Sequence, residues 1–98
     1  MNVILHTLNA SPSSPACSDC LRLLASGDAL LLLGDGVYAA LAGSADRARL
    51  DASGAAVYVL DTDAAAAGVL SRVDGVTIID IDGFVALTEQ CSRQLAWY

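Results

Sequence analysis

The sequence contains no lysine, and its five basic residues are all arginines scattered along 98 residues. Eleven aspartate and glutamate residues leave a formal net charge of −6 at pH 7. Because nucleic-acid binding draws much of its affinity from neutralisation of phosphates by Lys and Arg, no direct binding of nucleic acid is expected. If the protein acts in an RNA pathway, it must then act by binding other proteins rather than the RNA itself.

Long apolar runs are also missing. The unbroken apolar stretch at residues 29–33 is far shorter than the roughly 18 residues that a membrane-spanning helix needs. No basic segment precedes the first apolar residues, as it would in a signal peptide. The three cysteines are too few, and odd in number, for a complete disulfide framework, which suits a reducing compartment. We therefore expect a cytoplasmic protein without a membrane segment.

Apolar residues, by contrast, are abundant and make up 55% of the chain. A domain of this length buries only part of the surface that its unfolded chain exposes. Large exposed apolar patches usually mark sites where another protein binds. We therefore predict that part of the apolar surface lies at a subunit interface, which also makes a homo-oligomer of the isolated chain an expected form.

Strand-like and helix-like segments alternate along what we expect to be one domain, residues 1–98. Strands are predicted at residues 2–6, 29–33, 56–60, 76–79 and 94–97. Helices are predicted at residues 15–26, from 37 onward, in 62–72 with an interruption at Gly68, and at 84–91, whereas the polar segment 43–54 is expected to hold one helical turn. This alternation predicts a three-layer α/β/α fold with a mainly parallel sheet of about five strands. The strand order stays open.

Polar side chains follow the predicted strands, where open α/β sheets bind their ligands. They are His6, Asp35, Asp61, Asp63, Asp80 and Asp82. Aspartate commonly caps the helix that follows, so capping is the favoured role for each one, with an acidic Mg²⁺ site as the alternative. A packed histidine is favoured over a catalytic base for His6. No metal site and no cofactor is predicted.

Cys17 and Cys20 stand three residues apart in the segment ACSDCLRLL, at the start of the first predicted helix. They supply two of the four ligands that zinc needs, and they have the spacing of a redox pair. They also share a helical stripe with Leu21 and Leu24, which favours burial. A single thiol near a helix start could instead carry sulfur as a persulfide, because the helix dipole stabilises a thiolate there. For Cys91, burial is favoured.

Five blocks of the chain, in order, resemble the TusB/DsrH family. They are LHTLNASP (residues 5–12), CLRLLASGDALLLLGDGVYAAL (20–41), VYVLDTDAAAAG (57–68), IDIDGFVALT (79–88) and the terminal AW (96–97). The resemblance implies a DsrEFH-like domain and a subunit of a heterohexamer, TusBCD or its relative DsrEFH. The Tus complex relays persulfide sulfur from a TusA-like donor to a TusE-like acceptor, toward 2-thiolation of the wobble uridine in tRNA, whereas the Dsr complex acts in sulfur oxidation.

The resemblance also assigns residues. Cys20 stands where DsrH-type members have their cysteine, so it is the candidate sulfur carrier, whereas the principal carrier of the Tus complex belongs to TusD. Family members often have arginine where this chain has Ala67, which puts any role of that charge in doubt.

We therefore expect a TusB-like subunit that is mainly architectural and binds TusC-like and TusD-like partners. The sequence leaves open whether it has enzymatic activity of its own. The alternatives are a DsrH-type subunit of a sulfur-oxidation complex and a stand-alone Cys-x-x-Cys thiol-disulfide protein.

Overall fold

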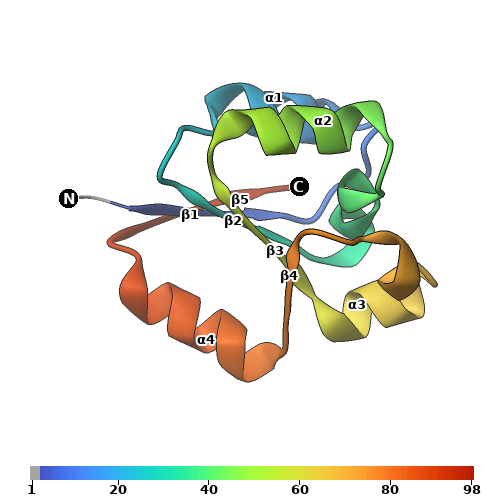
Figure 1. The fold of residues 1–98 in the computed structure, drawn as a ribbon. Coiled ribbons are helices and arrows are strands. Elements are labelled where there is room, and N and C mark those ends of the chain that lie inside the picture. The colour runs from blue at the N-terminus through green and yellow to red at the C-terminus, as the bar shows by residue number, and fades with distance from the viewer. Residues whose placement is uncertain (1–2) are drawn as a thin grey trace.

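In the computed structural model, which describes residues 3–98, five strands form one parallel sheet in the order β4-β3-β2-β1-β5 (Figure 1). The strands are β1 (Ile4–Leu8), β2 (Ala29–Leu32), β3 (Ala56–Leu60), β4 (Thr77–Ile79) and β5 (Arg93–Trp97). All four residues of β2 are buried, as a strand covered on both faces requires. The predicted α/β class, the three layers and the strand number are confirmed.

Helices cover both faces of the sheet. The helices α1 (Pro15–Leu23) and α2 (Ala45–Ser53) lie over one face, and α4 (Ile81–Gln90) crosses the other (Figure 1). The 3₁₀ helix η1 (Gly34–Ala40) follows the carboxyl end of β2, and the short α3 (Asp61–Ala66) follows that of β3. A second 3₁₀ helix, η2 (Leu70–Arg72), lies between α3 and β4. The larger core lies under α1 and α2, and a smaller one, which includes Leu5, Leu31 and Leu87, lies under α4.

The element boundaries differ from the predicted ones at several points. The first strand is Ile4–Leu8 rather than residues 2–6, so His6 lies within the strand and not after it; Asn2 is outside the described residues. The first helix ends at Leu23, because the backbone at Leu24 is already extended. The last helix begins at Ile81, since Asp80 accepts a hydrogen bond from the amide of Gly83 and so sets its start.

The largest difference concerns residues 43–54, where a full helix, α2, replaces the single turn that was expected. Ser44 caps this helix by accepting a hydrogen bond from the amide of Arg47 at 3.1 Å. Gly54 ends it with φ +76°, a conformation that glycine adopts without strain. The preceding segment, which was expected to open a helix, instead forms the 3₁₀ helix η1. Ser44 and Gly54 therefore set the two ends of α2.

The Gly34-Asp35-Gly36 turn brings the start of η1 against the end of β1. A Cβ atom at Gly36 would lie 2.2 Å from the carbonyl oxygen of Leu8, and Gly34 has φ +53°. Gly36 is therefore required by close packing against the β1 backbone, and Gly34 by its positive φ and by the side chain of Asn9, which lies where a Cβ atom would be. This steric role explains the two glycines without a bound phosphate.

We expect Gly36→Ala to lower the free energy of unfolding by about 1–3 kcal/mol, because the added methyl group forces the β1 backbone to move. Urea denaturation of the variant and the wild-type protein would measure the change. Asp35→Ala, at the exposed neighbouring position, serves as the control and should stay within about 0.5 kcal/mol of wild type. A Gly36→Ala protein as stable as wild type would show that the turn can accommodate a Cβ atom at this position.

Candidate functional site

The two cysteines of α1 lie in the protein core. The helix begins at Pro15, whose fixed backbone suits the first helical turn, and Ser14 caps it by accepting a hydrogen bond from Ala16 at 3.2 Å. Cys17 is 1% exposed and Cys20 is fully buried. Both pack with Leu21 and Leu24 in the core between α1 and the sheet. The predicted apolar stripe is confirmed.

Burial controls the chemistry of both thiols. Removal from water and, to a smaller extent, the neighbouring Cys17 together raise the pKa of Cys20 to about 12. Burial also raises the pKa of Cys17, as does the carboxylate of Asp46, while Arg49 opposes the shift. Desolvation thus outweighs the stabilisation of a thiolate that the helix start was expected to give. In this conformation both groups are protonated thiols, and the role of Cys20 as a sulfur carrier stays a prediction.

Cys91 is the most accessible of the three free cysteines, a feature that the sequence prediction of burial did not identify. It directly follows α4, where its amide donates a hydrogen bond to the carbonyl of Leu87. The side chain is half-buried against the smaller core. Burial and the nearby carboxylate of Asp28 raise the pKa of this thiol. Cys91 lies just beyond the end of a helix, and this position could have indicated its partial exposure.

The aspartates that follow β2, β3 and β4 lie near strand ends, as predicted. Asp63 accepts a hydrogen bond from the amide of Gly34 at 2.7 Å, Asp61 from that of Thr62 at 2.6 Å, and Asp80 from that of Gly83 at 2.8 Å. These three carboxylates therefore satisfy backbone amides. Among residues 3–98, no three or more His, Cys, Asp or Glu side chains are grouped so that they could hold a metal ion.

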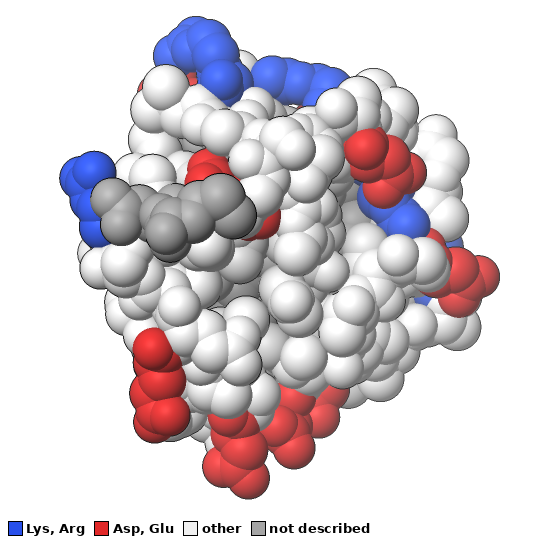
Figure 2. Space-filling view, turned by 60° about the vertical axis from the view of Figure 1, so that its left-hand side comes forward, with Lys and Arg blue, Asp and Glu red and all other residues white. Residues whose placement is uncertain are grey.

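An open pocket of about 220 Å³ lies beside this edge of the sheet, between η1 and α3. Its lining consists of Gly34, Asp35, Tyr38, Asp63, Ala66 and Ala67. Two carboxylates and no basic side chain line it, which is unfavourable for a phosphate or another anion. Figure 2 shows acidic side chains along the lower edge of the face that it displays and basic ones mainly at the upper edge.

His6 lies in the middle of β1 and is 1% exposed, so the favoured interpretation as a packed histidine is confirmed. Its Nε2 atom is 3.0 Å from Oδ2 of Asp28, and its Nδ1 atom is 3.1 Å from Nε1 of Trp97. No local sequence pattern indicates either partner, because Asp28 and Trp97 are distant from His6 along the chain.

A family model described as "DsrH like protein" matches residues 10–94. A protein from Pectobacterium parmentieri named Protein TusB is 45% identical over 95 residues, covering 96% of this chain and 100% of the relative. The chain belongs to the DsrH/TusB family. Protein TusB of Escherichia coli is 43% identical over 95 residues, with the same coverage of both chains. The resemblance read from the five sequence blocks is therefore confirmed over nearly the whole chain.

The fold has a solved counterpart. The crystal structure of the ychN protein from E. coli superimposes with a TM-score of 0.73 at 21% identity, covering 98% of this chain and 99% of that one. At that identity the likeness supports the fold alone, a five-stranded parallel sheet with helices on both faces. None of the described helices is long and apolar enough to cross a membrane.

Proposed function

We propose that this chain is the TusB subunit of a TusBCD-type sulfur relay, which passes persulfide sulfur toward 2-thiolation of the wobble uridine in tRNA. The observation that carries the proposal is identity of 42–45% to proteins named TusB along their entire length. The family model, whose description names DsrH, leaves a place in a sulfur-oxidation complex as the alternative.

An architectural role fits the chemistry of the described residues. The two cysteines of α1 are buried and protonated, so this conformation presents no reactive thiolate on that helix. Several large apolar side chains remain exposed, which suits a subunit whose surface is completed by partners. They are Leu23, Tyr38, Leu70, Ile78, Ile81, Val85, Leu95 and Tyr98.

The partners in this proposal are a TusC-like and a TusD-like subunit in the cytoplasm, with a TusA-like donor and a TusE-like acceptor. In each transfer, a thiolate attacks the outer sulfur of the donor persulfide, forms a new S–S bond and releases the donor thiolate. The net charge of −6 suits delivery of sulfur to proteins rather than binding of tRNA. This chain would support the subunit that carries the main cysteine.

Co-expression tests the assembly. We expect this chain, tagged and expressed with the TusC-like and TusD-like proteins of its own genome, to purify with both in equal amounts. Size-exclusion chromatography with light scattering would give the mass, and two copies of each subunit are expected. Elution of this chain alone, although all three proteins are soluble, would contradict the assembly.

The carrier role of Cys20 needs a separate measurement. If Cys20 carries sulfur, the assembled complex incubated with a persulfidated donor should gain about 32 Da on this chain, the mass of one sulfur atom. Peptide mapping should place the gain on Cys20, and Cys20→Ala should abolish it while Cys91→Ala should not. An unmodified chain within an active complex would remove the carrier role and leave the architectural one.

A further inference from the structure

The only histidine and the only tryptophan of the chain are in contact in the structure. His6 lies on the central part of β1, and Trp97 is the last residue of β5, the neighbouring edge strand. Their rings are nearly parallel, with centroids 6.3 Å apart and an interplanar angle of 18°. On its other side, the imidazole contacts Asp28 in the loop before β2. Asp28 is 8% exposed.

The partners of the imidazole fix its protonation state. An indole nitrogen can only donate a hydrogen bond, so Trp97 donates to Nδ1 of His6, which must be unprotonated. The proton then resides on Nε2, which donates to Oδ2 of Asp28; the same oxygen also accepts a hydrogen bond from the amide of Ala25 at 3.1 Å. The structure therefore requires neutral His6, with both ring nitrogens satisfied.

This arrangement bears on β5 because that strand has few other attachments. Among the described strands it pairs with β1 alone, and residues 93–96 are exposed. Beyond the ladder, a hydrogen bond from the amide of Asn9 to the carbonyl of Trp97, at 2.9 Å, holds its end. Trp97 is half-buried and packs against the larger core, whereas the following Tyr98 is 85% exposed. The indole is thus the main side-chain anchor of the carboxyl-terminal strand.

A second proton on His6 would make its contact with Trp97 unfavourable and keep its contact with Asp28 favourable. The proton must bind at Nδ1, where it faces the N–H group of Trp97, so that two donors oppose each other. The contact with Asp28 would instead become an ion pair, with a charge on both partners. Asp28 is the charged group in hydrogen-bond contact with the ring. The other titratable groups nearby are thiols. Cys17 and Cys20 face the sheet from α1, and Cys91 lies close enough to Asp28 for the carboxylate to raise its pKa.

We propose that His6 is a proton-operated latch for the carboxyl-terminal strand. Neutral His6 holds the Trp97 indole and the end of β5 on the sheet, and protonation releases the indole while Asp28 retains the imidazolium. Histidine is the side chain suited to this task, because uptake of one proton both charges its ring and turns an acceptor nitrogen into a donor. The latch is independent of the proposed sulfur relay and would operate in the isolated chain.

The single tryptophan and the single histidine make the latch directly measurable. Between pH 8 and pH 5, we expect the Trp97 emission to shift to longer wavelength and its quenching by acrylamide to rise several-fold. The ring protons of His6, followed by NMR, should change with the same midpoint. Far-UV circular dichroism should stay constant, since the sheet itself persists.

His6→Gln is the matched control, because a glutamine amide can donate to Asp28 and accept from Trp97 but does not titrate. Its emission should stay constant over the same pH range. Asp28→Asn, which withdraws the carboxylate that favours the imidazolium, should move the midpoint to lower pH. Two results would overturn the latch: Trp97 emission that stays constant in wild type while His6 titrates, or an unchanged emission shift in His6→Gln. If His6→Gln does not fold, the midpoint in Asp28→Asn decides, and an unmoved midpoint refutes the latch.

Discussion

Cys20 of the isolated native chain should react with iodoacetamide at pH 8 about 1,000 times more slowly than an exposed cysteine. Only the thiolate is nucleophilic, and a pKa of about 12 leaves about one Cys20 in 10,000 ionised at that pH. An ordinary exposed thiol, with a pKa of about 8.5, is about one-quarter ionised. Complete burial of the side chain slows access further.

Intact-mass and peptide analysis over time would measure the rate at each cysteine. Half-buried Cys91 should be modified first and serves as an internal reference, and all three cysteines should react in denaturant. Labelling of Cys20 as fast as Cys91 in the folded protein would contradict the buried position of the Cys20 side chain. The same measurement on the assembled complex has a second use, because a carrier role for Cys20 requires its labelling to accelerate there.

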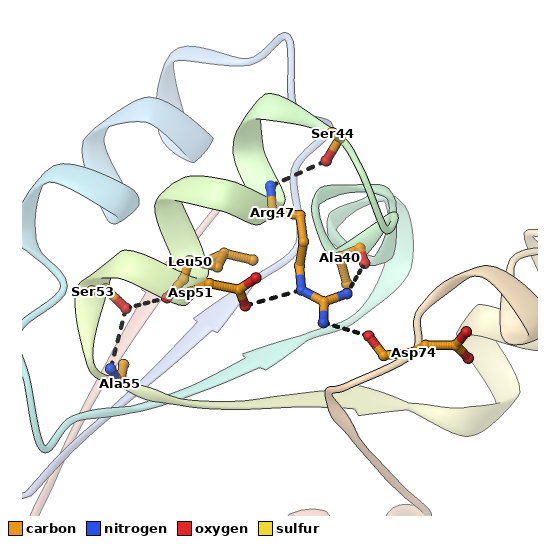
Figure 3. A network of polar contacts seen from close by, with 8 residues as sticks. All are labelled: Ala40, Ser44, Arg47, Leu50, Asp51, Ser53, Ala55 and Asp74. Carbon is orange, nitrogen blue, oxygen red and sulfur yellow. Dashed lines mark hydrogen bonds and ion pairs between the residues drawn. The ribbon is translucent and has the colours of Figure 1, made fainter.

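Replacement of Arg47 by methionine should lower the free energy of unfolding by about 2–4 kcal/mol, a large share of the stability of a small domain. The guanidinium is nearly buried and joins three segments (Figure 3). It donates to the carbonyl of Ala40 at 2.7 Å, to the carbonyl of Asp74 and to the carboxylate of Asp51 at 3.1 Å. Methionine fills much of the volume but leaves the two carbonyls without their donor.

Arg49→Met is the matched control, since Arg49 is exposed on the same helix. It should change the free energy of unfolding by at most about 0.5 kcal/mol. Urea denaturation at neutral pH would measure both variants. Equal stabilities of the two would show that the contacts of Arg47 contribute nothing beyond those of a surface arginine.

The sequence predicted the sheet well because buried parallel strands are continuous apolar runs. Residues 56–60 were predicted as a strand with the bounds that β3 has, and β2 differs by one residue. The strand order could not be predicted, since it depends on which strands pair across long connections. Helix α2 was underestimated because its anchor, Arg47, bonds to carbonyls 7 and 27 residues away in sequence.

The candidate site was only partly predictable, for a related reason. The stripe of Cys17, Cys20, Leu21 and Leu24 is a local helical pattern, so spacing alone predicted the burial of at least one of the two cysteines, and the structure buries both. The contact between His6 and Trp97 spans 91 residues, and no local pattern indicates it. The aspartates after the strands were located correctly, but their backbone partners became visible only with the fold.

The most direct test of the proposed function is the 2-thiouridine content of tRNA in an Escherichia coli strain that lacks its own TusB and expresses this chain. Nucleoside mass spectrometry of hydrolysed tRNA would measure it. We expect the chain to restore 2-thiolation of the wobble uridine. If its role is architectural, the Cys20→Ala variant should restore it as well. A chain that is expressed, folded and bound to the TusC and TusD subunits of that strain, yet leaves the tRNA without the 2-thio group, would contradict the proposal.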